Sequence, residues 1–251
     1  MSRLPALSRL LATVALAACP WLVQAQTLTV SAAASLTDAF KEIGARFDAG
    51  RGSTTRFNFA ASGVLLQQIL QGAPADVFAS ADQATMDRGV REQVLDAASR
   101  RDFAANTLVL IAPQGGVPLS RPEDLGGEAV RRIAVGKLAT VPVGRYTREA
   151  LESARLWTTV EPRLVQADSV RQVLDYVARG EVDAGFVYRT DAELMKDRVR
   201  LVATVGGHTP VRYPAAVVSA SRQAALARAF VDYLGGPEAQ AILGRHGFSR
   251  P

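Results

Sequence analysis

Short apolar and β-branched runs alternate with amphipathic stretches along the chain from position 26 onward. The short runs are typical of strands in a sheet, and they lie at 28–30, 56–60, 76–79, 107–112, 133–135, 163–166, 184–188, 199–205 and 215–218. The amphipathic stretches carry apolar residues at helical spacing and predict helices at 35–49, 62–71, 144–155, 169–179, 222–234 and 237–245. Strands that alternate with helices predict an α/β protein with mostly parallel sheets.

The order of these elements shows no break between domains. No internal repeat is visible, and no stretch rich in Ser and Gly divides the chain. If the chain forms two lobes, strands must therefore join them.

The first 25 residues have the pattern of a secretory signal peptide. Arg3 and Arg9 precede an apolar run from 10 to 18, and a small residue at Ala25 suits cleavage after that position. A membrane-spanning helix is the weaker interpretation, because the apolar run is shorter than the roughly 18 to 20 residues that a span needs. The residues before Cys19 resemble a lipoprotein cleavage motif, but the apolar residues after it favour export without a lipid anchor.

Composition excludes several classes of function. Lys and Arg number 29 against 24 Asp and Glu, and these charges form no long run of one sign. Aromatic residues make up only 6% of the chain, which argues against stacking on nucleic acid bases. With one Cys and two His, the chain cannot form an internal disulfide or a four-ligand zinc site of these residues.

Catalysis is weakly supported. Ser35 and Ser62 could be nucleophiles, but neither lies in a Gly-x-Ser-x-Gly elbow, and the only histidines, His208 and His246, lie in turn-like sequences. The chain has no Walker loop, dinucleotide fingerprint or His-Glu-x-x-His helix. We therefore expect no enzyme and no cofactor, and keep an exported serine hydrolase as a remote alternative.

Predicted helices begin with small or hydroxyl residues directly after predicted strands. Such helix starts occur at Ser35, at Ser62, at Val143 and at Ser169–Val170. Helix N-termini present unpaired N–H groups that can bind anions, and a parallel sheet gathers them at one edge. Ordinary N-capping explains any one of them equally well.

Such a site would bind its anion through neutral donors. Hydrogen phosphate carries a proton that needs an acceptor, and none of these positions supplies a carboxylate. Asp168 lies next to the fourth helix start, but we expect it to cap that helix. A fully deprotonated dianion is therefore the expected ligand.

Four segments together resemble the periplasmic molybdate-binding proteins of ABC transporters. They occur in order over essentially the whole chain after the leader, and they read AAASLTDAF at 32–40, AASG at 60–63, GAPADVFASAD at 72–82, and GPEAQ at 236–240 followed by Gly247-Phe248. The resemblance implies the type II periplasmic binding protein fold. In it, two α/β lobes are joined by two crossing strands, here 26–107 plus 214–251 as lobe 1 and 108–213 as lobe 2.

The resemblance also implies the ligand contacts. The oxyanion would lie between the lobes, bound by the hydroxyls and amides of Ser35 and Ser62, the backbone N–H groups of Val143 and Val170, and the phenol of Tyr188. No side chain would coordinate the metal itself. The family commonly has Ala where this chain has Val143, and the larger side chain could shift the preferred anion size.

The function implied is capture of molybdate, and also tungstate, in the bacterial periplasm. The protein would be a monomer that delivers the ion to a membrane permease driven by an ATPase, and it would bind no nucleic acid. Sulfate, thiosulfate or a small organic anion on the same scaffold is the nearest alternative.

Overall fold

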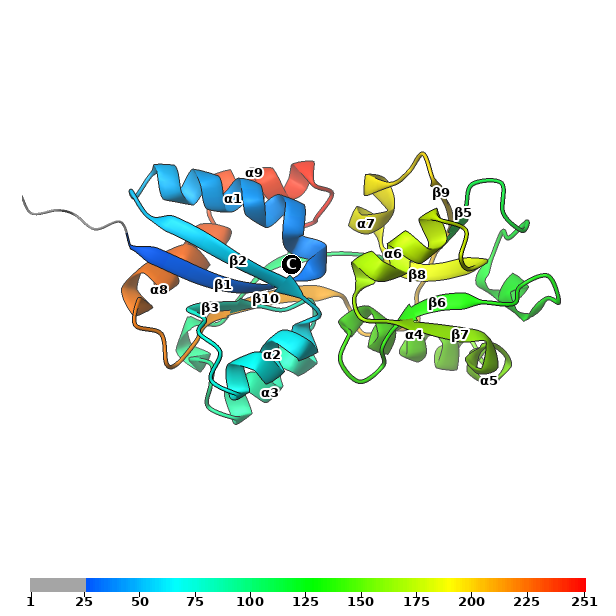
Figure 1. Ribbon diagram of the computed structural model, residues 1–251, viewed down its shortest axis with the longest axis horizontal. Helices are drawn as coiled ribbons and strands as arrows, with labels where there is room; N and C mark the ends of the chain where they lie inside the picture. The colour runs from blue at the N-terminus through cyan, green and yellow to red at the C-terminus, as the bar shows by residue number, and fades with distance from the viewer. Residues whose placement is uncertain (1–25) are drawn as a thin grey trace, which may run out of the picture.

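A computed structural model describes residues 26–251. Figure 1 shows two α/β lobes side by side, each built on its own sheet. The predicted signal peptide, with Cys19 and the cleavage position after Ala25, lies outside the described residues. Among residues 26–251, no helix is both long and apolar enough to cross a membrane.

Lobe 1 contains a five-stranded sheet in the order β2-β1-β3-β10-β4. Its strands are β1 (Thr27–Ala33), β2 (Thr54–Ala60), β3 (Val77–Ala79), β4 (Arg101–Ala105) and β10 (Arg212–Val217). One face is covered by α1 (Thr37–Ala49), α8 (Ala224–Leu234) and α9 (Pro237–Arg245), and the other by α2 (Ser62–Leu70) and α3 (Gln83–Arg91).

Lobe 2 contains a second five-stranded sheet in the order β7-β6-β8-β5-β9. Its strands are β5 (Leu108–Pro113), β6 (Ile133–Gly136), β7 (Leu164–Ala167), β8 (Ala184–Tyr188) and β9 (Val199–Thr204). Its helices α6 (Val170–Ala178) and α7 (Arg189–Leu194) lie on one side of the sheet, and α4 (Pro142–Ser153) and α5 (Trp157–Val160) on the other.

The two sheets share one plan. In each, three parallel strands are followed by an antiparallel fourth strand, β10 in lobe 1 and β5 in lobe 2. The carboxyl ends of the parallel strands in one lobe face those of the other (Figure 1). Helix N-termini from both lobes therefore meet in the space between them.

Two segments carry the chain between the lobes. The first runs from β4 to β5 through Asn106 and Thr107, and the second runs from β9 to β10. The backbone N–H of Asn106 donates to Val211 O at 3.1 Å, which pairs the two crossing segments.

Aromatic packing fixes the helices that cover lobe 1. The Phe40 ring, on α1, lies 5.6 Å from Phe103 on β4 and 6.0 Å from Phe230 on α8, measured between ring centroids. The ring of Phe47, which lies further along α1, is 5.0 Å from the Phe230 ring in an edge-to-face arrangement. These rings are fully buried, and edge-to-face pairs add to the stabilisation that burial provides.

Most predicted elements are confirmed, but some helix starts move and some elements were missed. A 3-10 turn at Ala34–Leu36 precedes α1, and α4 begins at Pro142, before the predicted position 144. Sequence patterning missed α3 and β4, because α3 has few apolar side chains and β4 lacks a clear alternation. It also missed the short α5 and α7.

Candidate oxyanion site

The five residues predicted from sequence line one small cavity between the lobes. Its wall is formed by Ala33, Ala34, Ser35, Ala60, Ala61, Ser62, Ala81, Val141, Pro142, Val143, Val170 and Tyr188. All five predicted residues are buried. No carboxylate and no cationic side chain is among the lining residues.

Ser35 reaches the cavity from the 3-10 turn that follows β1. Its side chain makes no capping hydrogen bond to that turn. Instead, Ser35 Oγ lies 3.0 Å from the hydroxyl of Tyr213 on β10. The residue is therefore not explained as an ordinary helix cap.

Ser62 is the first residue of α2, where Ala61 occupies the N-cap position. Ser62 Oγ accepts a hydrogen bond from the backbone N–H of Ala81 at 3.0 Å. Because that contact uses an oxygen lone pair, the hydroxyl hydrogen of Ser62 is left to donate into the cavity. This contact also brings the loop after β3 to the site.

Two backbone amides reach the cavity from lobe 2. Val143 is the second residue of α4, after Pro142, which has no N–H, and Val170 is the first residue of α6. The first N–H groups of a helix have no acceptor within the helix. The N–H groups of Val143 and Val170 can therefore bind an anion, and the positive ends of two helix dipoles reinforce them.

The prediction that Asp168 caps α6 is wrong. Ser169 is the N-cap, and its hydroxyl accepts from the backbone N–H of Gln172 at 3.2 Å. The Asp168 carboxylate forms an ion pair with Lys137 instead. Asp168 does not line the cavity, so it is not placed to accept a proton from a ligand there.

Tyr188 closes the wall of the cavity at the end of β8. Its hydroxyl is buried and has no hydrogen-bond partner in the part of the chain that the structure describes. Burial raises the pKa of Tyr188 well above its ordinary value of 10, which keeps the phenol protonated. An unpartnered buried donor is costly, and an anion in the cavity would satisfy it.

Contacts at the cavity rim hold the two lobes together. The backbone N–H of Gly63 donates to Thr140 O across the lobes at 3.0 Å. The Arg145 guanidinium, on α4, forms an ion pair with the buried Asp82 of lobe 1 and donates to Thr85 Oγ1 at 2.8 Å. The described structure is thus a closed arrangement of the lobes.

Arg171 makes the corresponding contacts from α6. Its guanidinium lies 2.9 Å from Asp38 Oδ2 of lobe 1 and donates to Asp191 Oδ1 of lobe 2 at 2.7 Å. It also donates to Ser35 O at 3.4 Å. Both rim arginines are therefore paired with carboxylates, and the cavity itself presents only neutral donors.

Sequence reasoning did not identify these rim residues. Arg145 and Arg171 follow the predicted amide donors within two positions, and that proximity was the only sequence signal for them. Their partners in lobe 1, Asp82 and Asp38, are distant in sequence.

Asp191 makes stability depend on pH. Burial raises the pKa of its carboxyl to about 6 from 3.8, although the Arg171 guanidinium acts in the opposite direction. The folded protein then binds more protons than the unfolded chain between about pH 4 and 6, so the contribution of this group to the free energy of unfolding falls as pH rises through that window. We expect Asp191→Asn to reduce that fall in urea unfolding curves, because an amide has no charge to bury.

The exposed Asp197 gives a matched control for this prediction. Asp197→Asn should keep the wild-type dependence on pH. An Asp191→Asn protein with the full wild-type slope between pH 4 and 6 would contradict the assignment.

Neither candidate nucleophile has a histidine beside it in the described chain. Ser35 contacts Tyr213, and Ser62 contacts the Ala81 amide. The His208 ring faces the carbonyl oxygens of Val205 and Thr209, and His246 contacts Glu42. The geometry therefore gives the hydrolase alternative no Ser–His pair.

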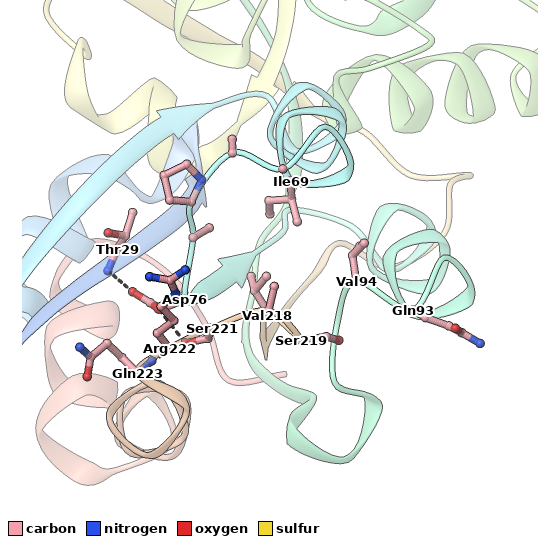
Figure 2. Close-up of a pocket in the computed structure, with 15 residues that line it drawn as sticks. Thr29, Ile69, Asp76, Gln93, Val94, Val218, Ser219, Ser221, Arg222 and Gln223 are labelled. Carbon is pink, nitrogen blue, oxygen red and sulfur yellow. Dashed lines mark hydrogen bonds between the residues drawn. The ribbon is translucent and has the colours of Figure 1, made fainter.

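A larger pocket lies in lobe 1, at the ends of the strands that point away from the cavity between the lobes (Figure 2). Asp76 lies in its wall and accepts from the Thr29 N–H at 2.8 Å and from the Ser221 hydroxyl at 2.6 Å. No lining side chain has a buried polar atom without a partner. The pocket thus lacks the unsatisfied donor that marks the cavity between the lobes.

Comparisons with known proteins point to one family. A family model described as bacterial extracellular solute-binding protein matches residues 28–249. The molybdate-binding protein ModA of Escherichia coli (strain K12) is 41% identical over 232 residues, which cover 88% of each chain. The solved structure of the Azotobacter vinelandii periplasmic molybdate-binding protein is 25% identical, with a TM-score of 0.76 over 89% of this chain and 99% of that chain.

The fold is also found with a different named ligand. The sulfate-binding protein SubI from Mycobacterium tuberculosis H37Rv matches with a TM-score of 0.76 at 18% identity, over 90% of this chain and 87% of that chain. At that identity the likeness concerns the fold alone, so the ligand must be argued from the site.

Proposed function

The chain belongs to the family of bacterial extracellular solute-binding proteins, and from that premise we propose that it binds molybdate between its lobes and delivers it to an ABC importer. The importer would comprise a membrane permease and an ATPase. Tungstate, a tetrahedral dianion of the same kind, would bind as well. Molybdate is the ligand named for the E. coli and A. vinelandii relatives.

One observation carries this proposal. Ser35, Ser62, Val143, Val170 and Tyr188 line one cavity, and the Tyr188 hydroxyl has no hydrogen-bond partner among residues 26–251. Donors from both lobes that converge on a small cavity suit an anion with acceptor oxygens on all sides. Charge-assisted hydrogen bonds in such a dry site are stronger than those between neutral groups.

The same donor set favours a fully deprotonated anion. A hydrogen phosphate ion would direct its proton at a hydroxyl, an amide or an apolar side chain, because no lining residue is a carboxylate. Molybdate, tungstate and sulfate carry no proton near neutral pH and avoid that cost.

Ligand binding would stabilise the closed state. Ser35 and Ser62 belong to lobe 1, whereas Val143, Val170 and Tyr188 belong to lobe 2, so one anion contacts both lobes only when they are closed. We propose 26–107 plus 214–251 and 108–213 as the two moving units. The protein would act as a monomer in the periplasm, exported by the segment that ends at Ala25 and not lipidated at Cys19.

A thermal unfolding series with different anions tests the proposed ligand. At about 100 times its Kd, a ligand adds roughly 2.7 kcal/mol, which raises the Tm of a protein of this size by roughly 5 to 10 °C. We expect such a shift with molybdate and with tungstate but not with phosphate. A shift with sulfate or thiosulfate alone would assign a different anion to the same site, and no shift with any oxyanion would contradict the proposal.

A further inference from the structure

We propose that Asn106 and Tyr213 are positioning residues that fix the Ser35 hydroxyl as a hydrogen-bond donor toward the bound anion. Neither residue lines the cavity. Asn106 lies in the first segment that crosses between the lobes, and Tyr213 lies at the start of β10, which the second crossing segment leads into. The inference rests on the proposed role of Ser35 in binding an oxyanion.

The orientation of the Asn106 amide sets the direction of this hydrogen-bond chain. Asn106 Oδ1 accepts from the backbone N–H of Thr107 at 2.8 Å. The Nδ2 group must then face the other way, and it donates to Thr190 Oγ1 at 2.9 Å and to the Tyr213 hydroxyl at 3.3 Å. Since an amide nitrogen only donates, the Tyr213 oxygen is the acceptor in that contact.

The Tyr213 hydroxyl passes this direction on to Ser35. Its oxygen accepts from Asn106, so its own hydrogen is free to donate to Ser35 Oγ at 3.0 Å. The Tyr213 side chain is fully buried, and burial raises the pKa of its phenol far above 10, so that this hydrogen stays in place. Ser35 Oγ accepts the Tyr213 hydrogen, so the hydrogen of the Ser35 hydroxyl points away from Tyr213. Ser35 lies on the cavity wall, where that hydrogen can reach the anion.

Tyr213 also supports the second phenol of the site. Its ring centroid lies 6.0 Å from that of Tyr188 in an edge-to-face arrangement. Tyr213 thus contacts one proposed ligand group from each lobe, Ser35 and Tyr188. This arrangement favours anions without a proton, because Tyr213 occupies one of the two lone pairs of Ser35 Oγ and the Ser35 hydrogen is directed at the anion.

Tyr213→Phe removes the hydroxyl and keeps the ring. One neutral hydrogen bond is worth about 0.5 to 1.5 kcal/mol, so we expect molybdate affinity to fall about threefold to tenfold in isothermal titration calorimetry. Both lone pairs of Ser35 Oγ would then be free to accept. We therefore expect the affinity for hydrogen phosphate relative to sulfate to rise about threefold or more.

Asn106→Asp reverses the direction of the chain. A carboxylate at this position accepts from Tyr213, whose oxygen then accepts from Ser35, and the Ser35 lone pairs turn toward the anion. We expect a larger loss of molybdate affinity than in Tyr213→Phe, about tenfold or more. The added negative charge repels every dianion similarly, so the phosphate-to-sulfate ratio isolates the reversal and should rise here too.

Thr190→Val is the matched control, because it removes the other partner of Asn106 Nδ2 and leaves the contacts to Tyr213 and Ser35. It should keep wild-type molybdate affinity and the wild-type anion ratio. Thermal unfolding without ligand identifies any variant that fails to fold. If one of Tyr213→Phe and Asn106→Asp fails, the other still tests the positioning role.

Two outcomes separate this inference from the proposed function. If the wild-type protein binds an oxyanion but Tyr213→Phe or Asn106→Asp leaves both the affinity and the ratio unchanged, the positioning role is wrong and the function stands. If the wild-type protein binds no oxyanion, the positioning role and the proposed function both fail, because the hydrogen-bond chain that ends at Ser35 would have no anion to donate to.

Discussion

Replacing Gly63 with alanine is expected to weaken anion binding about tenfold to a hundredfold without destabilising the ligand-free protein. A Cβ at this position would lie 2.6 Å from Thr140 O and 2.9 Å from Thr140 Cα. Gly63 belongs to lobe 1 and Thr140 to lobe 2, so the clash exists only when the lobes are closed. Both obstructing atoms are backbone atoms, and no change of rotamer can relieve the contact.

The expected magnitude follows from overpacking. An extra methyl group in a tightly packed contact costs about 1 to 3 kcal/mol, and here that cost falls on the closed state alone. The Gly63 N–H would also move away from Thr140 O, with which it makes an interlobe hydrogen bond of 3.0 Å. Isothermal titration calorimetry measures the loss of anion affinity, and small-angle scattering with saturating ligand shows whether the lobes close.

Gly244→Ala provides the control for this substitution. Gly244 lies within α9, and a Cβ there would meet nothing within 4 Å. This variant should bind as the wild type does. A Gly63→Ala protein with wild-type affinity and a wild-type closed shape would show that the closed arrangement described here is not the ligand-bound one.

Replacing Ser62 with alanine is expected to lower molybdate affinity about tenfold to a hundredfold as well. The substitution removes a hydroxyl hydrogen aimed at a charged ligand, and hydrogen bonds to charged groups are worth roughly 1.5 to 3 kcal/mol. It also leaves the Ala81 N–H without its acceptor, Ser62 Oγ. A modest loss of stability should therefore accompany the loss of affinity.

Ser99→Ala separates these two effects. Ser99 is also buried, and its Oγ accepts from the backbone N–H of Val217 at 2.8 Å, but it does not line the cavity. We expect this variant to lose stability and to retain full affinity in calorimetry. Wild-type affinity in Ser62→Ala would place the anion elsewhere.

Ser35 and Ser62 differ from ordinary helix caps in their hydrogen-bond partners, which are the Tyr213 hydroxyl and the Ala81 N–H. Ser169 caps α6 in the expected way, with its hydroxyl on the Gln172 N–H. Ser35 and Ser62 make no such contact at the start of a helix. Capping and ligand binding thus use the same residue types at similar positions, and only the hydrogen-bond partners distinguish them.

The sequence by itself determined the α/β class, most strands and helices, and the family to which the chain belongs. It also named five of the residues that line the cavity, four of them from helix starts that follow strands and Tyr188 from the family resemblance. This was possible because the turn from a strand into a helix is local: β1 leads directly to Ser35, β2 to Ser62 and β7 to Val170. The periodicity of apolar residues fixes where each strand ends, and the next helix must then begin at the same edge of the sheet.

The tertiary structure alone decided how these residues are oriented and how the lobes meet. Ser35 contacts Tyr213 across 178 positions, Arg145 pairs with Asp82 across 63, and Arg171 reaches Ser35 across 136. Gly63 meets Thr140 only because two sheets face each other. Such contacts follow from how the two lobes pack together, and no local periodicity encodes which distant side chain will complete a hydrogen bond.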